Sequence, residues 1–423
     1  MSSRLKRSLL ELRSFPGQFW VLTLGILIYV AAAALAFPFE GIYLHRVLGA
    51  SMSMVGVVFG LVPVAVMPMQ FWGGHLTDRL GRRWVILLSV SMGVVWFAGF
   101  AFVTEVWQVA LLVAIESSLG WPLFQTASNA MIADLLPPEK RQEAFSVSRV
   151  AMNLGVVMGP AAAGLALGFG VTFRELFLAA AAGCALMVAI MFFSIRESRP
   201  ASATAPEKHR DAQGRSGYRI VFHDRVFLVF CLVAVLPVFC IGNFGSIYSV
   251  YITDFLGVPY GEWGMLLALN AFIVATVQYP LVRATRLKNR MVLLAIASAA
   301  LAAGIGGSAF AGPLWSLVVL IVVMSIGETL LSPVASAEVS DLAPEAVRGR
   351  YMGVWTIAWN GGAALGPAFG GWAMDAFGGR QAFAILLVEG LIGAGLFLAL
   401  APGWKRRREQ ARAAAGRPRP ETA

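Results

Sequence analysis

Long apolar runs separated by short polar segments make up most of this chain. A helix needs about 20 mostly apolar residues to cross a bilayer. The runs lack the alternating pattern of barrel strands, so they predict an all-α membrane protein with twelve transmembrane helices. The first run is too long for the apolar part of a signal peptide, so we expect it to remain in the protein. The runs cover residues 17–44, 52–74, 84–104, 107–133, 143–169, 175–195, 226–256, 262–282, 291–311, 314–340, 350–376 and 381–401.

The composition supports a lipid environment. Of the 423 residues, 58% are hydrophobic and 13% are charged, whereas soluble domains carry about 25% charged residues. A disordered tail protein and a soluble nucleic-acid-binding protein are therefore excluded. Cys184, Cys231 and Cys240 lie inside apolar runs without nearby histidines, so we expect neither disulfides nor metal ligands, and no cofactor.

The basic residues fix the predicted orientation. With the N-terminus inside, 29 of the 33 Lys and Arg residues fall on the cytoplasmic side. Only Arg46, Arg174 and Arg380 fall outside, and Arg149 lies within a run. This distribution follows the positive-inside rule, so we expect both termini in the cytoplasm. The net charge of +10 thus reflects topology. We expect a monomer in a bacterial inner (cytoplasmic) membrane.

One long polar segment divides the twelve runs into six and six. It is rich in Pro, Ser, Ala and charged residues between 199 and about 217, a composition typical of flexible linkers. The basic tail after Trp404 predicts a disordered end. The predicted parts are a six-helix bundle at 1–196, a cytoplasmic linker at 197–222, a second six-helix bundle at 223–402 and a basic tail at 403–423.

An internal repeat relates the two halves. Shifting the sequence by 207 residues aligns 134–164 with 341–371 without a gap, and 12 of the 31 aligned positions are identical. Because each half has six spans, both repeats have the same orientation in the membrane. Repeats related by an axis along the membrane normal are found in secondary transporters, where the halves rock about a central site. The repeat therefore favours transport over a static scaffold.

The loop after the second run carries a specific motif. Residues 74–83 read Gly-His-Leu-Thr-Asp-Arg-Leu-Gly-Arg-Arg. This segment closely resembles the signature of the major facilitator superfamily, and with the twelve runs and the repeat the resemblance covers the whole chain. It implies alternating access and a gate in which Asp78 meets the eleventh helix near Gly349. The corresponding loop at 283–290 is basic but lacks the Asp. The implied gate residues are Gly74, Asp78, Arg79, Gly81, Arg82, Arg83, Asp134 and Arg141.

The fifth and eleventh runs each carry a Gly-x-x-x-Gly-Pro pattern. Small residues four positions apart let helices approach closely, and proline bends a helix. The pattern resembles a motif of antiporters in the same superfamily, although helix packing alone also explains it. The residues are Gly155, Gly159, Pro160, Gly164, Gly362, Gly366 and Pro367.

Ionisable residues inside spans are costly and point to function. Glu116 stands where exporters of this family commonly have an arginine, four residues before Gly120. From a rise of 1.5 Å per residue, Glu116 lies about 15 Å and Arg149 about 13 Å from the ends of their helices. We predict that they pair or share a proton-linked network. Glu328 and Glu389 complete the set of predicted proton-coupling residues, and structural hydrogen bonding is the alternative for both. Glu40, Glu105, Asp254 and Glu262 are expected in the solvated outer rim.

A substrate cavity also needs aromatic and amide side chains. The candidates lie on the fourth, fifth, seventh, eighth and eleventh runs, where each aromatic residue could instead pack or face lipid. They are Trp121, Gln125, Asn153, Asn243, Tyr248, Asn270, Trp359 and Asn360.

These features predict a proton-coupled secondary transporter whose partners are a small-molecule substrate, protons and the bilayer, with no nucleic acid. The sequence lacks a Gly-x-x-x-x-Gly-Lys-Ser/Thr nucleotide loop, so we expect neither ATP-driven transport nor an enzyme. The leading hypothesis is an antiporter that exports small amphipathic organic compounds or drugs. Three alternatives remain: a symporter that imports a metabolite, a lipid translocase, and a membrane receptor without transport activity.

Overall fold

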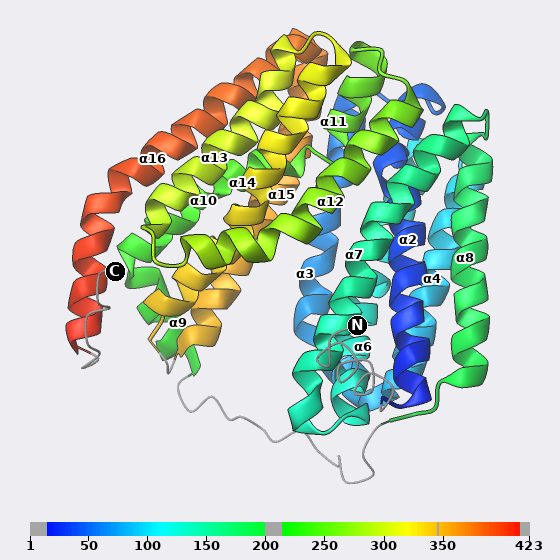
Figure 1. Cartoon of the computed structure of the whole chain (residues 1–423), viewed down its shortest axis with the longest axis horizontal. Coiled ribbons are helices and arrows are strands. Elements are labelled where there is room, and N and C mark those ends of the chain that lie inside the picture. Colours follow the sequence, from blue (N-terminus) through cyan, green and yellow to red (C-terminus); the bar gives the residue numbers. More distant parts are fainter. Residues whose placement is uncertain (1–14, 199–213, 345–346, 415–423) are drawn as a thin grey trace, which may run out of the picture. The chain divides into compact units, whose positions relative to one another are not determined.

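The computed structural model describes residues 15–198, 214–344 and 347–414, and within these ranges it contains helices and no strand. The predicted all-α class is thus confirmed. The helices that precede the polar segment are α2 (Gly17–Arg46), α3 (Met52–Leu80), α4 (Arg82–Phe102), α5 (Val106–Leu119), α6 (Trp121–Leu135), α7 (Pro138–Gly168) and α8 (Phe173–Ser194) (Figure 1).

The remaining helices follow the polar segment. They are α9 (Gly214–His223), α10 (Arg225–Gly242), α11 (Ile247–Val250), the π-helical turn η1 (Tyr251–Phe255), α12 (Tyr260–Thr285), α13 (Arg290–Ile305), the 3-10 turn η2 (Gly306–Phe310), α14 (Leu314–Leu342), α15 (Arg348–Phe377) and α16 (Gly379–Ala414).

Twelve helical segments have the length of a membrane span. Eleven of them, within the described residues, are also apolar enough to cross a bilayer. The twelfth is α15, which has 30 residues. All twelve coincide with the predicted runs, because a continuous apolar run in lipid satisfies its backbone polar groups only as a helix.

Three spans are built from consecutive helical pieces. The fourth span breaks at Gly120 between α5 and α6, and the seventh breaks between α10 and α11. The ninth span ends in the 3-10 turn η2. The first two breaks coincide with short polar and glycine segments, Glu116–Gly120 and Gly242–Ser246, which lie within apolar runs and were counted as part of them.

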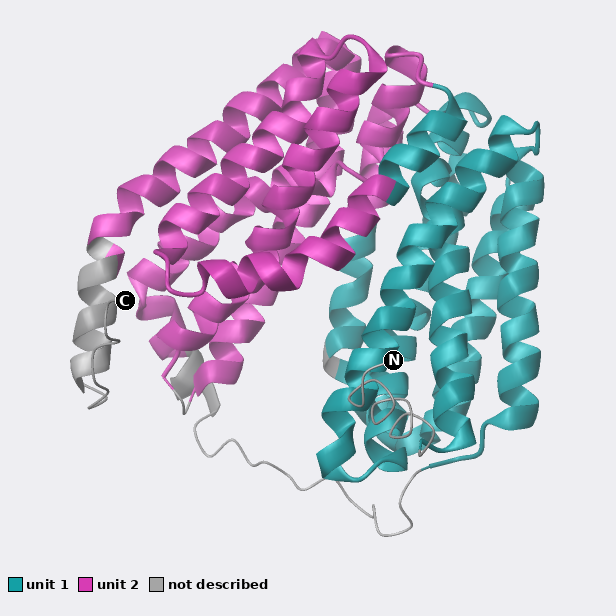
Figure 2. Ribbon diagram, in the orientation of Figure 1, with its two compact units in different colours: residues 1–49, 61–208, 259–268 teal, residues 50–60, 209–258, 269–423 magenta. Residues whose placement is uncertain are grey.

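The chain forms two compact units, shown in Figure 2. Unit 1 comprises residues 1–49, 61–208 and 259–268, and unit 2 comprises 50–60, 209–258 and 269–423. The first turns of α3 therefore group with unit 2, and the first turns of α12 group with unit 1. The bundle boundaries expected from the sequence follow the polar segment instead, and they stay a prediction.

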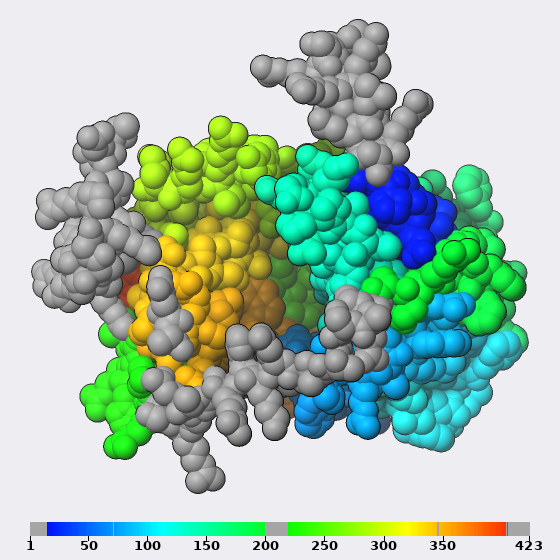
Figure 3. Space-filling model, turned by 90° about the horizontal axis from the view of Figure 1, so that it is seen from below, coloured from blue at the N-terminus to red at the C-terminus, as the bar shows by residue number. Residues whose placement is uncertain are grey.

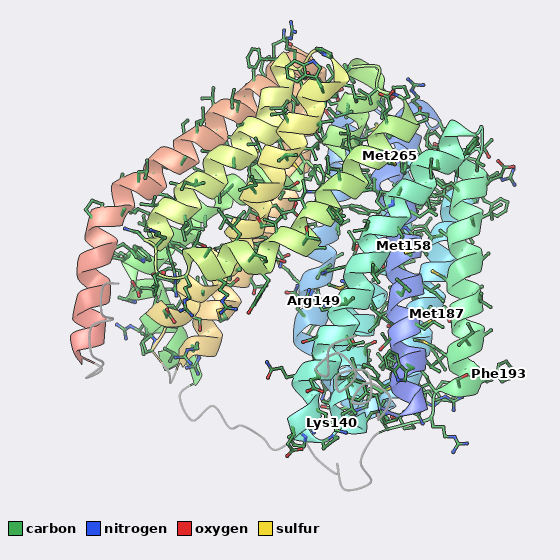
Figure 4. The ribbon with its side chains drawn as sticks, viewed as in Figure 1. Lys140, Arg149, Met158, Met187, Phe193 and Met265 are labelled. Atoms are coloured by element: carbon green, nitrogen blue, oxygen red, sulfur yellow. The ribbon has the colours of Figure 1, made fainter. Side chains whose placement is uncertain are left out.

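Unit 1 is packed around α2, which contacts α7 and α8, while α4 also packs on α8. Met187 of α8, labelled in Figure 4, packs against Gly25 of α2. A Cβ at position 25 would overlap the Met187 side chain, so the two helices pack closely here because residue 25 is glycine. Tyr43 of α2 meets Phe177 of α8 at 5.3 Å between ring centroids, and Phe100 of α4 meets the same ring at 5.2 Å. Small residues and aromatic rings together hold these three helices.

Unit 2 is packed around α13, which contacts α14 and α16, while α10 packs on α15. The rings of Tyr251 and Phe383 stack with centroids 4.1 Å apart. This contact anchors the π-helical turn to α16.

Two predicted irregular segments contain helix. Helix α9 begins at Gly214, inside the predicted linker, and α16 continues to Ala414, inside the predicted tail. The basic residues that marked the tail as polar are also good helix formers, so the last span extends past its apolar part. Residues 1–14, most of the linker and the last part of the tail lie outside the described residues.

Candidate functional site

The two copies of the glycine motif make equivalent contacts. On α7, Gly155 and Gly159 face α2: a Cβ at Gly159 would lie 2.7 Å from the Ala31 carbonyl oxygen. On α15, Gly362 and Gly366 face α10, the first span of the second half. The repeat read from the sequence thus corresponds to the same helix packing in each half.

The second part of each motif receives another glycine-bearing helix. In unit 1, Gly264 of α12 packs on Pro160 and Gly164, and a Cβ at Gly164 would lie 2.9 Å from the Gly264 Cα. In unit 2, Gly56 of α3 packs on Pro367 of α15 in the same manner. Neither pair of helices could approach this closely with larger side chains at these positions.

An ion network occupies the end of unit 1 that carries the 74–83 motif. The guanidinium of Arg82 lies 3.0 Å from an Asp78 carboxylate oxygen and 3.0 Å from one of Asp134. Arg82 is the first residue of α4 and its side chain is only 10% exposed. The structure therefore brings together three of the predicted gate residues, which come from α3, α4 and α6.

Glu197, which no sequence motif marks, also belongs to this network. Its carboxylate accepts hydrogen bonds from the backbone N–H groups of Arg82 (3.0 Å) and Arg83 (3.2 Å). The carboxylate lies against Gly81, whose φ of 93° belongs to the left-handed region that favours glycine. Anions are stabilised at helix N-termini, so Glu197 ties the end of the first half to the start of α4.

The other predicted gate residues have separate environments. Arg83 donates to the Phe192 carbonyl oxygen at 2.7 Å, and Arg141 donates to the Leu136 carbonyl oxygen at 3.2 Å. Gly74 has open space where a Cβ would lie. The expected meeting of Asp78 with the eleventh helix, and the gating role of Arg79, stay predictions.

Unit 2 contains a counterpart of this network. Arg290, the first residue of α13, lies 2.9 Å from Asp341, which is the repeat equivalent of Asp134. Glu338 supplies the second carboxylate at 2.8 Å and also accepts from Trp404 Nε1 at 2.6 Å. The second half thus lacks the loop Asp, as the sequence indicates, and has a carboxylate from α14 instead.

The unit 1 network gives a testable prediction about stability. Replacing Arg82 with Gln leaves two carboxylates without their guanidinium, so we expect the free energy of unfolding to fall by about 1–3 kcal/mol. Thermal melting of the purified variant in detergent measures this. Adding Asp134→Asn to the same variant should cost little more, because the pair is already broken. The matched control is Arg149→Gln, which should melt like the wild type. Equal melting of all variants would contradict the assignment.

Glu116 sits at the break of the fourth span. Its Oε1 accepts a hydrogen bond from the Tyr29 hydroxyl and another from the Trp121 backbone N–H, both at 3.3 Å. The helix restarts at Trp121, so its first N–H groups lack intrahelical acceptors. Glu116 satisfies one of these N–H groups, that of Trp121. The carboxylate thus stabilises the start of α6 directly after the break at Gly120.

The expected pairing of Glu116 with Arg149 is absent from the described residues. Arg149 is exposed on α7 (Figure 4), and α7 forms part of the surface of unit 1 in Figure 3. The depth estimate placed both residues at one level but could not give their direction around each helix. The exposed and half-exposed positions Gln142, Ser146 and Asn153 share the face of Arg149, so this face of α7 is polar within a span.

Glu328 belongs to a small polar cluster in unit 2. Asn270 Nδ2 on α12 donates to Glu328 Oε2 and to Ser325 Oγ on α14, each at 3.0 Å. Asn270 is 7% exposed and Ser325 is fully buried. The structure thus joins a predicted proton-coupling residue to a predicted cavity residue.

Glu389 has a different environment. Its two carboxylate oxygens are buried and have no hydrogen-bond partner among the described residues. The residue lines an apolar cavity of about 420 Å³ between α10 and α16.

The remaining cavity candidates divide into two groups. Asn243 and Tyr248 are fully buried: Asn243 donates to the Phe239 carbonyl oxygen at the break of the seventh span, and Tyr248 packs on Phe383. Both side chains therefore lie in the interior of unit 2. The others are exposed or half-exposed, as a substrate site requires; they are Trp121, Gln125, Asn153, Trp359 and Asn360.

The expected place of Glu40 in the solvated rim is wrong. Glu40 is fully buried, and its Oε1 accepts from Trp96 Nε1 at 2.7 Å. Glu105 and Glu262 are exposed, as expected. The apolar run continues past Glu40 as far as Leu44. This continuation indicates that Glu40 lies within the span.

The Glu40–Trp96 hydrogen bond yields a second stability prediction. In a Trp96→Phe variant the Glu40 carboxyl loses its donor while the ring volume changes modestly. We expect a loss of about 1–3 kcal/mol in the free energy of unfolding, seen as a lower melting temperature. Trp107→Phe, at an exposed position of α5, is the matched control and should have no such effect. If both variants melt alike, Glu40 does not depend on Trp96.

The fold and the site together indicate the class of protein. Two repeated six-span halves with ionisable side chains inside the spans define a membrane transporter with internal symmetry. A model of the Major Facilitator Superfamily matches residues 22–304 and 230–422, and the chain belongs to that family. It is therefore an integral membrane protein of a transporter family.

Several relatives align with most of the chain. The MFS-type transporter YqjV of Bacillus subtilis is 28% identical over 90% of this chain and 93% of its own. The multidrug resistance protein MdtH of Klebsiella pneumoniae is 29% identical, covering 91% and 93%. A Na(+), Li(+), K(+)/H(+) antiporter of Planococcus maritimus is 28% identical, covering 79% and 84%.

Solved structures agree on the fold. The nucleoside transporter NupG superposes with a TM-score of 0.75 over 91% of this chain and 99% of that one, at 16% identity. At this identity the likeness concerns the fold alone.

Proposed function

We propose that the chain is a proton-coupled antiporter that exports small amphipathic organic compounds by alternating access. The observation that carries the proposal is the Glu328–Asn270–Ser325 cluster, a carboxyl group inside a span with a defined hydrogen-bond donor. A carboxyl in this setting can take up a proton on one side of the membrane and release it on the other.

Asn270 of the Glu328 cluster lies on α12, the helix that also carries Gly264. Asn270 lies six residues after Gly264 on the same helix, an axial separation of about 9 Å. Gly264 packs on Gly164 of α7, and Asn270 donates to Glu328 of α14. A change of protonation at Glu328 alters the acceptor that holds Asn270.

The names of the relatives support exchange rather than co-transport. MdtH is named for multidrug resistance, and the Planococcus maritimus protein is named as a cation/proton antiporter. The latter name favours one second candidate, the exchange of alkali cations for protons. The half-exposed aromatic ring of Trp121 and the exposed amide of Gln125 fit an amphipathic organic substrate better.

Transport into proteoliposomes tests the proposal. With an acidic lumen, we expect ethidium, an amphipathic cation, to accumulate while protons leave. Accumulation from an acidic exterior would instead indicate symport. Proton release driven by Na⁺, Li⁺ or K⁺ alone would favour the second candidate, and leaflet exchange of a labelled phospholipid would indicate a lipid translocase.

A further inference from the structure

One carboxylate joins the start of α3 to the end of α15. Asp375 lies in the last turn of α15, which ends at Phe377. Its Oδ2 accepts hydrogen bonds from the Ser53 backbone N–H at 2.7 Å and from the Ser53 hydroxyl at 2.6 Å, and its Oδ1 accepts from the Met52 backbone N–H at 3.1 Å. Met52 is the first residue of α3, and the first N–H groups of a helix have no acceptor within that helix. Asp375 therefore caps α3 from a different helix with both of its carboxylate oxygens.

These hydrogen bonds connect the two repeated halves of the sequence. Helix α3 belongs to the first half and α15 to the second, and Ser53 and Asp375 are 322 positions apart. Residues 50–60, which include the start of α3, group with unit 2, whereas the helix from residue 61 onward groups with unit 1 (Figure 2). From unit 2, Asp375 thus holds the start of a helix that continues into unit 1.

Close backbone packing accompanies this cap. A Cβ at Gly371, one turn before Asp375, would overlap the Met52 carbonyl oxygen, and one at Gly56 would overlap the Pro367 carbonyl oxygen. Glycine at these positions lets the backbones of α3 and α15 touch. The hydrogen bonds of Asp375 need this close approach, so they are lost in any conformation in which the two helix ends separate.

The repeat-related contact in unit 1 has a glycine in place of the carboxylate. A shift of 207 residues places Gly168 of α7 where α15 has Asp375. A Cβ at Gly168 would have Gly261, in the first turn of α12, as its nearest neighbour at 4.0 Å. Equivalent helix ends thus meet in both halves, but a glycine cannot supply the bridge that Asp375 makes. Helix packing alone therefore does not require a carboxylate at this place.

We propose that Asp375 acts as a latch: its hydrogen bonds to Met52 and Ser53 hold α3 on α15 in the conformation of this structure, and they break in the opposite conformation of the transport cycle. The basic residues predict that this end of α3 faces outward, so release of the latch accompanies opening to the outer side. The inference rests on the alternating access of the proposed function, and it requires neither proton coupling nor a particular substrate. A contact made in only one of two conformations shifts their equilibrium by its own free energy.

The rate at which the latch opens can be measured on single molecules. Fluorescent dyes are attached to Trp107→Cys of unit 1 and Trp315→Cys of unit 2, whose native side chains are 64% and 68% exposed, while the three native cysteines are buried. Energy transfer between the dyes, in full-length protein in nanodiscs without substrate or pH gradient, reports transitions between a short and a long distance. We expect Asp375→Ala to raise the rate of opening about tenfold, because a helix cap is lost. The rate of closing should not change, because closing starts without these bonds.

Glu175→Ala is the matched control. The Glu175 carboxylate also binds a helix start, since it accepts from the Thr172 N–H and from the Thr172 hydroxyl at 2.8 Å each, but it does so within unit 1 alone. The opening rate of this variant should equal that of the wild type. If Asp375→Ala melts well below the wild type, Ser53→Ala replaces it; this change removes one of the three hydrogen bonds and should raise the opening rate about threefold.

Three results overturn the latch: an unchanged opening rate in the variant that decides, an equal rise in the opening and closing rates, or one fixed distance in every variant. Ethidium transport plays no part in this assay, so a failure of proton-coupled antiport leaves its result unaffected.

Discussion

Replacing Glu328 with Gln is expected to abolish proton-driven transport while leaving the protein folded. Gln keeps the size of the side chain and can still accept from Asn270 Nδ2 through its own amide oxygen, so the α12–α14 hydrogen bond survives. It cannot take up and release a proton. We therefore expect ethidium accumulation under a pH gradient to fall about tenfold or more, measured in proteoliposomes of matched protein content.

Downhill exchange separates coupling from general damage. Glu328→Gln should still exchange labelled for unlabelled substrate across a membrane without a pH gradient, and Glu262→Gln should behave like wild type in both assays. Proton-driven accumulation at the wild-type rate in Glu328→Gln would remove this residue from the coupling mechanism.

A valine at Gly164 is expected to have the second large effect. The Cβ alone would lie 2.9 Å from Gly264 Cα and 3.0 Å from the Gly261 carbonyl oxygen, so α7 and α12 would have to separate. Overpacking of this kind costs about 1–3 kcal/mol. We expect a transport rate reduced at least about tenfold, because the variant disfavours the conformation in which α7 and α12 are in close contact.

Gly168 provides a control on the same face of α7, one turn later. A Cβ there has its nearest neighbour, Gly261 Cα, at 4.0 Å, so Gly168→Val should transport normally. Gly264→Val should reproduce the defect of Gly164→Val. Normal transport in both Gly164→Val and Gly264→Val would show that transport does not need the close approach of α7 and α12.

The sequence predicted the fold well because the bilayer restricts it. The apolar runs gave all twelve spans, and the 207-residue repeat predicted the shared packing that Gly159 and Gly366 display. The breaks at Gly120 and after Gly242 were missed. Side chains next to the breaks satisfy some of the freed backbone groups: Glu116 accepts from the Trp121 N–H, and Asn243 donates to the Phe239 carbonyl oxygen. Hydropathy does not report such contacts.

The candidate site was predicted in part. Asp78 and Arg82 belong to the 74–83 motif, and the family resemblance implied that Asp134 lies close by; the structure brings the three together. The pairing of Glu116 with Arg149 failed because depth along a helix says nothing about the direction of a side chain around it. Glu197 was missed because it acts from the start of a polar segment, where a carboxylate has no distinctive pattern. Glu40 was misplaced because its position was judged from the end of the run.

Proton movement driven by substrate tests the central claim most directly. Proteoliposomes that contain a pyranine pH indicator are loaded with ethidium and diluted into ethidium-free buffer without a pH gradient. Antiport predicts that outward ethidium flow acidifies the lumen in wild-type vesicles and leaves it unchanged in Glu328→Gln vesicles. Ethidium efflux without any change of luminal pH, or with alkalinisation, would contradict proton-coupled antiport.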